Sequence, residues 1–220
     1  MNIRSKVKSA SMAVILLLLF TGCASFSRNQ LPNAANLLQL SENNSKPTAS
    51  YSFSSGIDLF GKQEHQENVR KKLEDEFISV FRESGYFASL TPGGQAEMNI
   101  EVRLVNSGTP AAMIPAMITG FSLYTIPSWA TDHYTVTAKV TTQDGKEHIY
   151  ELTDAMTTVQ WLPMILVFPF QNMVNVSKQV RQNIWKNLIL KMQKDGVLSQ
   201  NVPVGQTDHL VIQFEWSFHG

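Results

Sequence analysis

The sequence lacks the motifs from which a catalytic activity can be predicted. It contains no GxSxG nucleophile elbow, no glycine-rich phosphate-binding loop and no HExxH zinc motif. Its histidines are scattered, without the i, i+4 spacing or the cysteine partners that metal sites favour. We therefore predict no catalytic residue, no cofactor-binding residue and no metal ligand. The histidines are His65, His133, His148, His209 and His219.

The sequence also has little cysteine and no excess of charge of either sign. Cys23 is the only cysteine, so the chain cannot form an internal disulfide. The 220 residues include 18 Lys and Arg and 18 Asp and Glu. Removal of residues 1–22, which hold three basic residues and no acidic one, would leave 15 basic against 18 acidic residues. This near-neutral balance is not the electrostatic pattern of a nucleic-acid-binding protein, and we expect no nucleic-acid partner.

The N-terminus has the composition of a secretory signal. Three basic residues within the first eight positions precede an apolar stretch, residues 13–20, that is too short to span a bilayer permanently. The stretch ends in Phe20-Thr21-Gly22-Cys23, which resembles the lipobox of bacterial lipoproteins, with Phe20 at a position that is usually Leu. The resemblance implies that residues 1–22 are a signal peptide and that Cys23 becomes a lipidated N-terminus.

Lipidation would account for the single cysteine and would decide where the protein resides. The resemblance implies a thioether-linked diacylglycerol and an N-acyl chain on Cys23, and more than one chain gives stable anchoring. Ala24 follows Cys23, where an Asp would signal retention in the inner membrane. We therefore expect a protein of the bacterial cell envelope, anchored to the outer membrane and facing the periplasm. Its expected partners are the membrane itself and an envelope protein complex or lipid.

Composition divides the remainder into a tether and one domain. Residues 23–49 are rich in Ser, Asn and Ala and include Pro32 and Pro47, which predicts a flexible tether. As a random coil, such a tether would span on the order of 25–30 Å. Residues 50–220 have the length of a single domain with its own core.

Periodic apolar residues predict an α+β domain. A 3.6-residue period predicts two amphipathic helices, and a period of two predicts five strands in an antiparallel or mixed sheet, with both helices on one face. This order of elements is loosely similar in topology to small envelope lipoproteins such as the lipopolysaccharide-assembly lipoprotein. The expected helices lie within 63–85 and 172–196, and the expected strands at 51–53, 98–104, 134–141, 149–158 and 210–218.

Two uncharged apolar runs, residues 104–131 and 155–177, flank a predicted hairpin. Gln143-Asp144-Gly145 supplies its turn, and this register places His133 opposite Ala155 and Trp129 opposite Val159. The two runs would then lie side by side at one end of the sheet.

Three interpretations of the paired runs remain open. They could be short helices or turns that close the core, with prolines setting their boundaries. They could insert shallowly into the bilayer or form a partner surface, because Trp and Tyr favour the membrane interface. A transmembrane pair needs about 20 residues per span, and 161–170 has half that length. The candidate membrane or partner contacts are Tyr124, Trp129, Trp161, Leu162, Phe168 and Phe170.

Two classes of function fit these features. The main hypothesis is a non-enzymatic envelope lipoprotein that serves binding, assembly or scaffolding. The alternatives are a periplasmic hydrolase, whose site is assembled from residues far apart in the sequence, and an accessory subunit of an envelope transport complex. A polar pocket with converging Asp and His side chains would favour the hydrolase, and a dry apolar end would oppose it.

Overall fold

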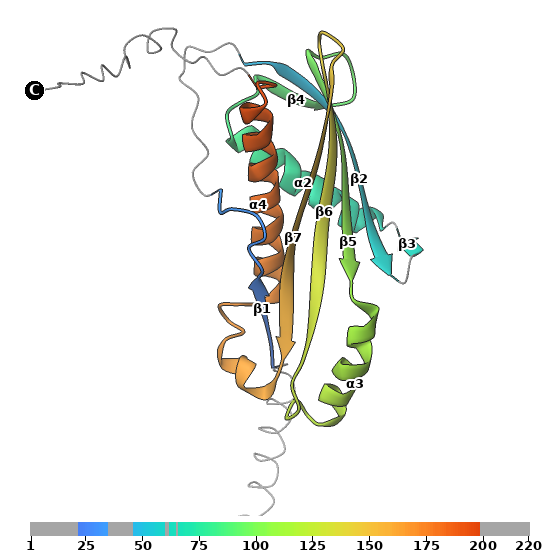
Figure 1. Cartoon of the computed structure of the whole chain (residues 1–220), viewed down its shortest axis with the longest axis vertical. Coiled ribbons are helices and arrows are strands. Elements are labelled where there is room, and N and C mark those ends of the chain that lie inside the picture. The colour runs from blue at the N-terminus through green and yellow to red at the C-terminus, as the bar shows by residue number, and fades with distance from the viewer. Residues whose placement is uncertain (1–21, 35–45, 60–61, 65, 199–220) are drawn as a thin grey trace, which may run out of the picture.

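The described part of the chain forms one mixed sheet with helices on one face (Figure 1). The computed structural model describes residues 22–34, 46–59, 62–64 and 66–198. This confirms the predicted α+β class. The strands are β1 Cys23–Ser27, β2 Thr48–Leu59, β3 Lys62–Glu64, β4 Ser89–Pro92, β5 Met98–Gly108, β6 Ser128–Thr142 and β7 Glu147–Gln160. The helices are α2 Glu67–Glu83, α3 Met113–Phe121 and α4 Met173–Lys194, with 3₁₀ helices η1 Pro110–Ala112 and η2 Leu162–Leu166.

The strands form a seven-stranded sheet in the order β1-β7-β6-β5-β2-β3, with β4 also paired to β2. The pairs β1–β7, β7–β6, β6–β5 and β2–β3 are antiparallel, whereas β2 runs parallel to β5 and β4. The β6–β7 hairpin has the predicted register, with His133 opposite Ala155 and Trp129 opposite Val159. A tight turn with Gly145 at φ 79° connects the two strands, as the local sequence indicated.

Helices α2 and α4 enclose the core against one face of the sheet. α4 contacts β7 and β1, and α2 contacts β2 and β4. Phe77 of α2 and Trp185 of α4 are both fully buried, and their ring centroids lie 5.4 Å apart. Phe53 of β2 stacks on Phe77 from the sheet side, with centroids 5.8 Å apart. Burial of these aromatic side chains stabilises this part of the molecule.

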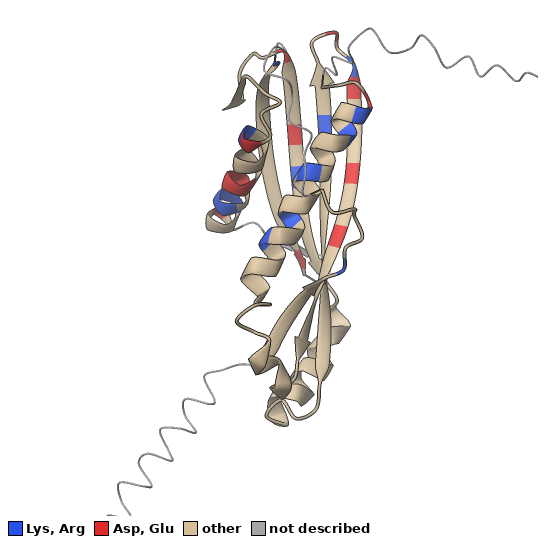
Figure 2. Cartoon of the chain, turned by 90° about the vertical axis from the view of Figure 1, so that its left-hand side faces the viewer, with Lys and Arg blue, Asp and Glu red and all other residues tan. Residues whose placement is uncertain are grey.

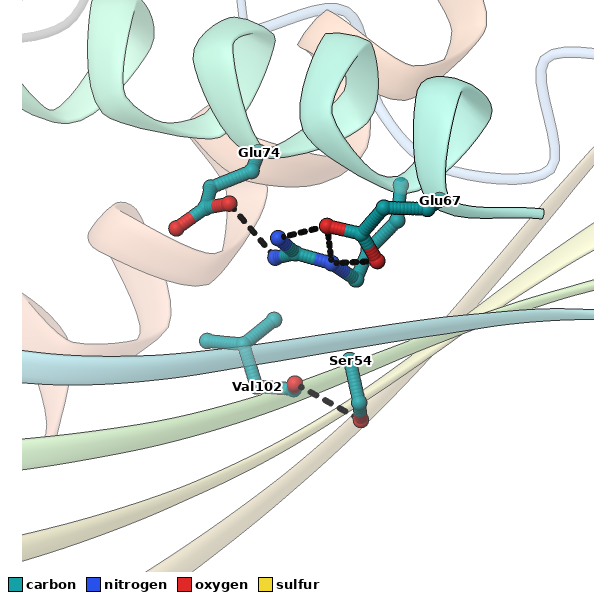
Figure 3. Close-up of polar contacts among 5 residues, drawn as sticks. Ser54, Glu67, Glu74 and Val102 are labelled. Carbon is teal, nitrogen blue, oxygen red and sulfur yellow. Dashed lines mark hydrogen bonds and ion pairs between the residues drawn. The ribbon is translucent and has the colours of Figure 1, made fainter. Parts of the chain in front are cut away.

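Charged side chains pair along helix α2 (Figure 3). Arg70 donates to Glu67 Oε1 and to Glu74 Oε2, each at 2.6 Å. These are the i, i+3 and i, i+4 spacings at which side chains meet on a helix surface. Beneath the helix, Ser54 Oγ of β2 donates to the Val102 carbonyl oxygen of β5 at 3.3 Å. These ion pairs thus support helix α2 through local side-chain contacts.

The prediction of a flexible tether is wrong for residues 23–34. Cys23–Ser27 forms the edge strand β1, in which Cys23 lies opposite Gln160 of β7. Farther along, the Ala34 N–H donates to Asn183 Oδ1 at 2.9 Å, and Asn183 Nδ2 donates to the Pro32 carbonyl oxygen at 3.1 Å. Composition did not indicate this order, because the hydrogen-bond partners that fix the segment lie more than a hundred residues away. Residues 35–45 of the predicted tether lie outside the described residues.

Both predicted helices are present, and the sheet is larger than predicted. Helix α2 begins at Glu67, and Gln63 and Glu64, the first two residues of the predicted helix, belong instead to β3. Strands β1, β3 and β4 were not predicted, and the strand expected at 210–218 lies outside the described residues. Two prolines of the first apolar run set boundaries, since Pro110 begins η1 and Pro127 immediately precedes β6, whereas Pro115 lies within α3.

Candidate functional site

One end of the molecule carries no charged residue. We define this charge-free end as residues 109–131 and 156–174, which include η1, α3, η2 and the adjoining ends of β6 and β7. Figure 2 shows the charged residues on the helices and on the strands beside them, with none at this end. This uncharged end, on a chain with 36 charged residues, is the candidate contact surface of the molecule.

Helix α3 turns its apolar side chains outward. A helix on a soluble protein normally directs its apolar stripe to the core and its polar residues to solvent. In α3 the fully buried residue is instead Thr119, whose Oγ1 donates to the Pro115 carbonyl oxygen at 3.0 Å. The arrangement is therefore inverted relative to that of a soluble protein. The large exposed side chains of α3 are Met113, Ile114, Met117, Ile118 and Phe121.

The turn after α3 holds strained backbone. Leu123 and Tyr124 adopt φ angles of 52° and 63°, in the left-handed region that non-glycine residues rarely occupy. The Tyr124 N–H donates to the Thr119 carbonyl oxygen at 2.8 Å, which ends the helix. Such a conformation costs on the order of 1–3 kcal/mol per residue and is found mainly at functional sites. Here the strained turn leaves the Leu123 side chain exposed.

The second apolar run lies beside the first, as the hairpin predicted. The Leu162 N–H at the start of η2 donates to the Tyr124 carbonyl oxygen at 2.8 Å. Trp129 of β6 lies opposite Val159 of β7 and is 66% exposed. No helix among the described residues is both long enough and apolar enough to cross a membrane. The two runs thus form one surface at one end of the sheet, and their largest apolar side chains point to solvent instead of closing the core.

All six predicted contact residues lie at the charge-free end. Five have exposed side chains, and the sixth, Tyr124, is half-buried. The sequence-based choice missed Phe121 and Leu166, which are 86% and 78% exposed. Both lie in the uncharged runs, so the absence of charge around them could have identified them as contact residues. In the first run, only Trp and Tyr were predicted as contacts. The five exposed residues are Trp129, Trp161, Leu162, Phe168 and Phe170.

Cys23 lies at the same end as these side chains. It is the first residue of β1 and lies opposite Gln160, the last residue of β7. The Ser25 N–H donates to the Gln171 carbonyl oxygen at 2.7 Å, so β1 is also joined to the segment that follows η2. An acyl chain on Cys23 would therefore begin next to the exposed apolar side chains, with no intervening flexible segment.

The described residues offer little for catalysis. They include no group of three or more His, Cys, Asp or Glu side chains placed to hold a metal ion. Asp132 and His133 are neighbours on β6, and successive side chains of a strand point to opposite faces. Asp132 lines a cleft beside α4, where burial raises the pKa of its carboxyl group against the opposing effect of His133.

Comparison with known proteins yields fold likenesses only. No protein-family model matches the sequence, and no curated protein matches it. A Xanthomonas campestris protein of the DUF330 family is similar in structure, with 10% identity and a TM-score of 0.39 over 70% of this chain and 89% of that one. A dodecameric PelC variant from Paraburkholderia phytofirmans has 9% identity and a TM-score of 0.28 over 76% of this chain and 96% of its own. At these values neither likeness identifies a shared site or activity.

Proposed function

We propose that this protein is a lipid-anchored, non-enzymatic component of the bacterial envelope that docks its charge-free end on a membrane. The observation that carries the proposal is the position of Cys23 beside the exposed apolar side chains. The lipobox-like sequence and the exposed surface were identified independently, one from residues 20–23 and the other from the fold. Their meeting at one end supports a single membrane-facing surface.

The energetics favour insertion once the anchor holds the protein at the bilayer. Moving a side chain such as Phe121 or Leu166 from water to an apolar environment contributes roughly 1.5–3 kcal/mol. Trp129 and Trp161 suit the interfacial region, where an aromatic ring meets both lipid and water. No charged group lies within the charge-free end, so shallow insertion would desolvate none of its side-chain charges.

Docking by this end would direct the remaining surface away from the membrane. The β6–β7 turn, with Asp144 and Lys146, lies at the opposite end of the hairpin, and the charged faces of α2 and α4 lie between the two ends. Ala24 after Cys23 supports the outer membrane as the destination. The polar sheet face and the helices would then be available to an envelope complex, which agrees with a role in assembly, transport or scaffolding.

Vesicle flotation of the Cys23→Ser protein, exported with a cleavable signal, tests docking without the anchor. We expect this protein to float with phosphatidylethanolamine–phosphatidylglycerol vesicles. Phe121→Asp, Leu166→Asp and Phe170→Asp together should reduce the bound fraction at least about tenfold, because three exposed apolar groups are replaced by charges. The matched control is Ile149→Asp, which alters an exposed apolar residue on β7 outside the charge-free end and should leave binding unchanged.

Two results would contradict the proposal. If the Cys23→Ser protein stays fully soluble, monomeric and unbound to vesicles, membrane docking is wrong. If it self-associates without binding vesicles, and the triple Asp variant abolishes that association, the charge-free end is a protein interface. Lipidation has a separate test, because mass spectrometry of the mature chain must find acyl groups on Cys23.

A further inference from the structure

A cleft between α2 and α4 adjoins the charge-free end and differs from it by carrying charged side chains. The two helices meet at Glu76 and Arg181, whose carboxylate and guanidinium are joined by hydrogen bonds of 2.8 and 3.0 Å. From this pair toward both helix N-termini, a cleft of about 490 Å³ opens over β5, β6 and β7. Its volume falls in the range of about 300–1,000 Å³ that is typical of small-molecule sites.

The cleft is lined mainly by apolar groups. Val69 and Leu73 form the wall on α2, Met173 and Val174 form the wall on α4, and Met156 contributes to the floor. Unbranched methionine side chains adapt to flexible apolar ligands. These lining groups favour an alkyl chain over a polar metabolite.

The cleft also carries polar groups, which include Lys72, Glu76, Asn106, Asp132, Lys178 and Arg181. Lys72 on α2 and Lys178 on α4 place one exposed cation on each wall. Arg181 is already paired with Glu76 and also lies 5.6 Å from the ring centroid of Tyr134. On the floor, Asn106 Oδ1 is buried and has no hydrogen-bond partner among the described residues. A buried polar atom without a partner is uncommon and marks a place where a ligand or water can bind.

We propose that this cleft binds one amphiphile that has a single alkyl chain and an anionic head, such as a fatty acid. The alkyl chain lies against Leu73 and Met156, and the anionic head lies at the rim between Lys72 and Lys178. Outside the Glu76–Arg181 pair, the cleft is lined by two cations, Lys72 and Lys178, and by one carboxyl group, that of Asp132, so its charges favour an anionic head over a cationic one.

The cleft also connects with the charge-free end. Met173 and Val174 belong to both surfaces, and both side chains are exposed. A lipid-derived ligand could therefore enter from the membrane on which the protein is proposed to dock. Binding itself does not require docking, because the cleft is formed by α2, α4 and the sheet.

Isothermal titration of the Cys23→Ser protein with dodecanoate, below its micellar concentration, tests the proposal. We expect one molecule to bind per chain. Decanoate should bind about tenfold more weakly, because two fewer methylene groups are buried. Dodecyltrimethylammonium, which has the same chain length and the opposite charge, should bind at least about tenfold more weakly than dodecanoate.

Substitutions of residues that line the cleft test whether dodecanoate binds there. Lys72→Gln with Lys178→Gln should weaken dodecanoate binding about tenfold, as expected when two exposed charge contacts are lost. The matched control, Lys71→Gln with Lys191→Gln, changes exposed lysines of the same two helices outside the cleft and should have no effect. Val69→Trp should fill the cleft from its partly exposed wall and abolish binding without disturbing the core.

The outcomes separate this proposal from membrane docking. Saturable binding of dodecanoate that survives the triple Asp substitution at the charge-free end supports the cleft, whatever the vesicle result. Equal affinity for dodecanoate and dodecyltrimethylammonium would contradict the anionic-head assignment. Absence of saturable binding, or equal binding by the Val69→Trp variant, would overturn the cleft site even if the protein floats with vesicles.

Discussion

Strands β6 and β7 run through two regions that differ in the solvent exposure of their apolar side chains. In the helix-covered region, Phe77 is 0% exposed and Trp185 is 1% exposed. At the charge-free end, Phe121 is 86% exposed and Trp129 is 66% exposed. The difference lies in what covers the apolar groups, because α2 and α4 end before the sheet does. An apolar residue thus contributes to the stability of one region and, in our account, to the membrane contact of the other.

The largest expected effect on stability comes from comparing the same substitution, Phe to Ala, in the two regions. Phe77→Ala should lower the free energy of unfolding by about 3–5 kcal/mol, because it leaves a cavity in the aromatic core. Phe121→Ala should change it by less than about 0.5 kcal/mol, because the side chain already faces solvent. Urea unfolding of both variants measures the difference. Equal losses would show that the charge-free end is part of the core in solution.

The second prediction concerns the ion pair where α2 and α4 meet. Glu76→Ala should cost about 3 kcal/mol, because it leaves the buried Arg181 guanidinium without its partner. Combining Glu76→Met with Arg181→Met should recover most of the loss, since no unpaired charge remains. Chemical unfolding of the single and double variants tests this. A double variant no more stable than the single one would mean that the pair supports the fold through more than charge compensation.

The smallest expected effect concerns pH and Asp132, at the boundary between the two regions. Burial raises the pKa of Asp132, so the folded protein retains this proton at pH values where the unfolded chain, with a pKa of about 3.9, has lost it. The contribution of Asp132 to stability therefore falls as pH rises from below about 4 through the raised folded pKa. Asp132→Asn should remove this decline, so its stability relative to wild type should increase over that window. Unfolding midpoints across pH measure the difference.

Asp144 at the hairpin turn provides a control, because its pKa is shifted in the opposite direction to that of Asp132. Lys146 and Thr142 hold its pKa below the usual range, so its contribution to stability is present above the unfolded pKa and is lost as pH falls. Asp144→Asn should therefore lose stability relative to wild type as pH rises from acid conditions. The account of Asp132 would fail if both variants showed the same trend.

The central hairpin could be predicted from the sequence because its determinants are local. The turn at Asp144 and Gly145 and the alternating side chains of the flanking strands were sufficient to pair Trp129 with Val159. Helices α2 and α4 could likewise be predicted from the sequence, since each carries its own stripe of apolar residues. The edge strand β1 was not predictable in this way, because the groups that pair with Cys23–Ser27 lie on β7.

The candidate surfaces were predictable only in part. The uncharged runs and their pairing could be read from the sequence, but their exposure could not, because an apolar run does not specify what it packs against. The outward orientation of α3 depends on the position of the whole helix at the end of the sheet, which buries Thr119 and leaves its apolar neighbours free. The cleft was not apparent at all, since Lys72 and Lys178 come from helices about a hundred residues apart.

Tryptophan fluorescence in brominated lipid tests most directly whether the charge-free end enters the membrane. The lipidated wild-type protein and a Trp129→Phe, Trp161→Phe variant would be reconstituted in vesicles with and without brominated acyl chains. Their difference isolates the two tryptophans of this end, because the other two, Trp185 and Trp216, are present in both proteins. Our account predicts that brominated lipid quenches this difference signal. A difference signal of equal intensity in brominated and unbrominated vesicles would contradict it.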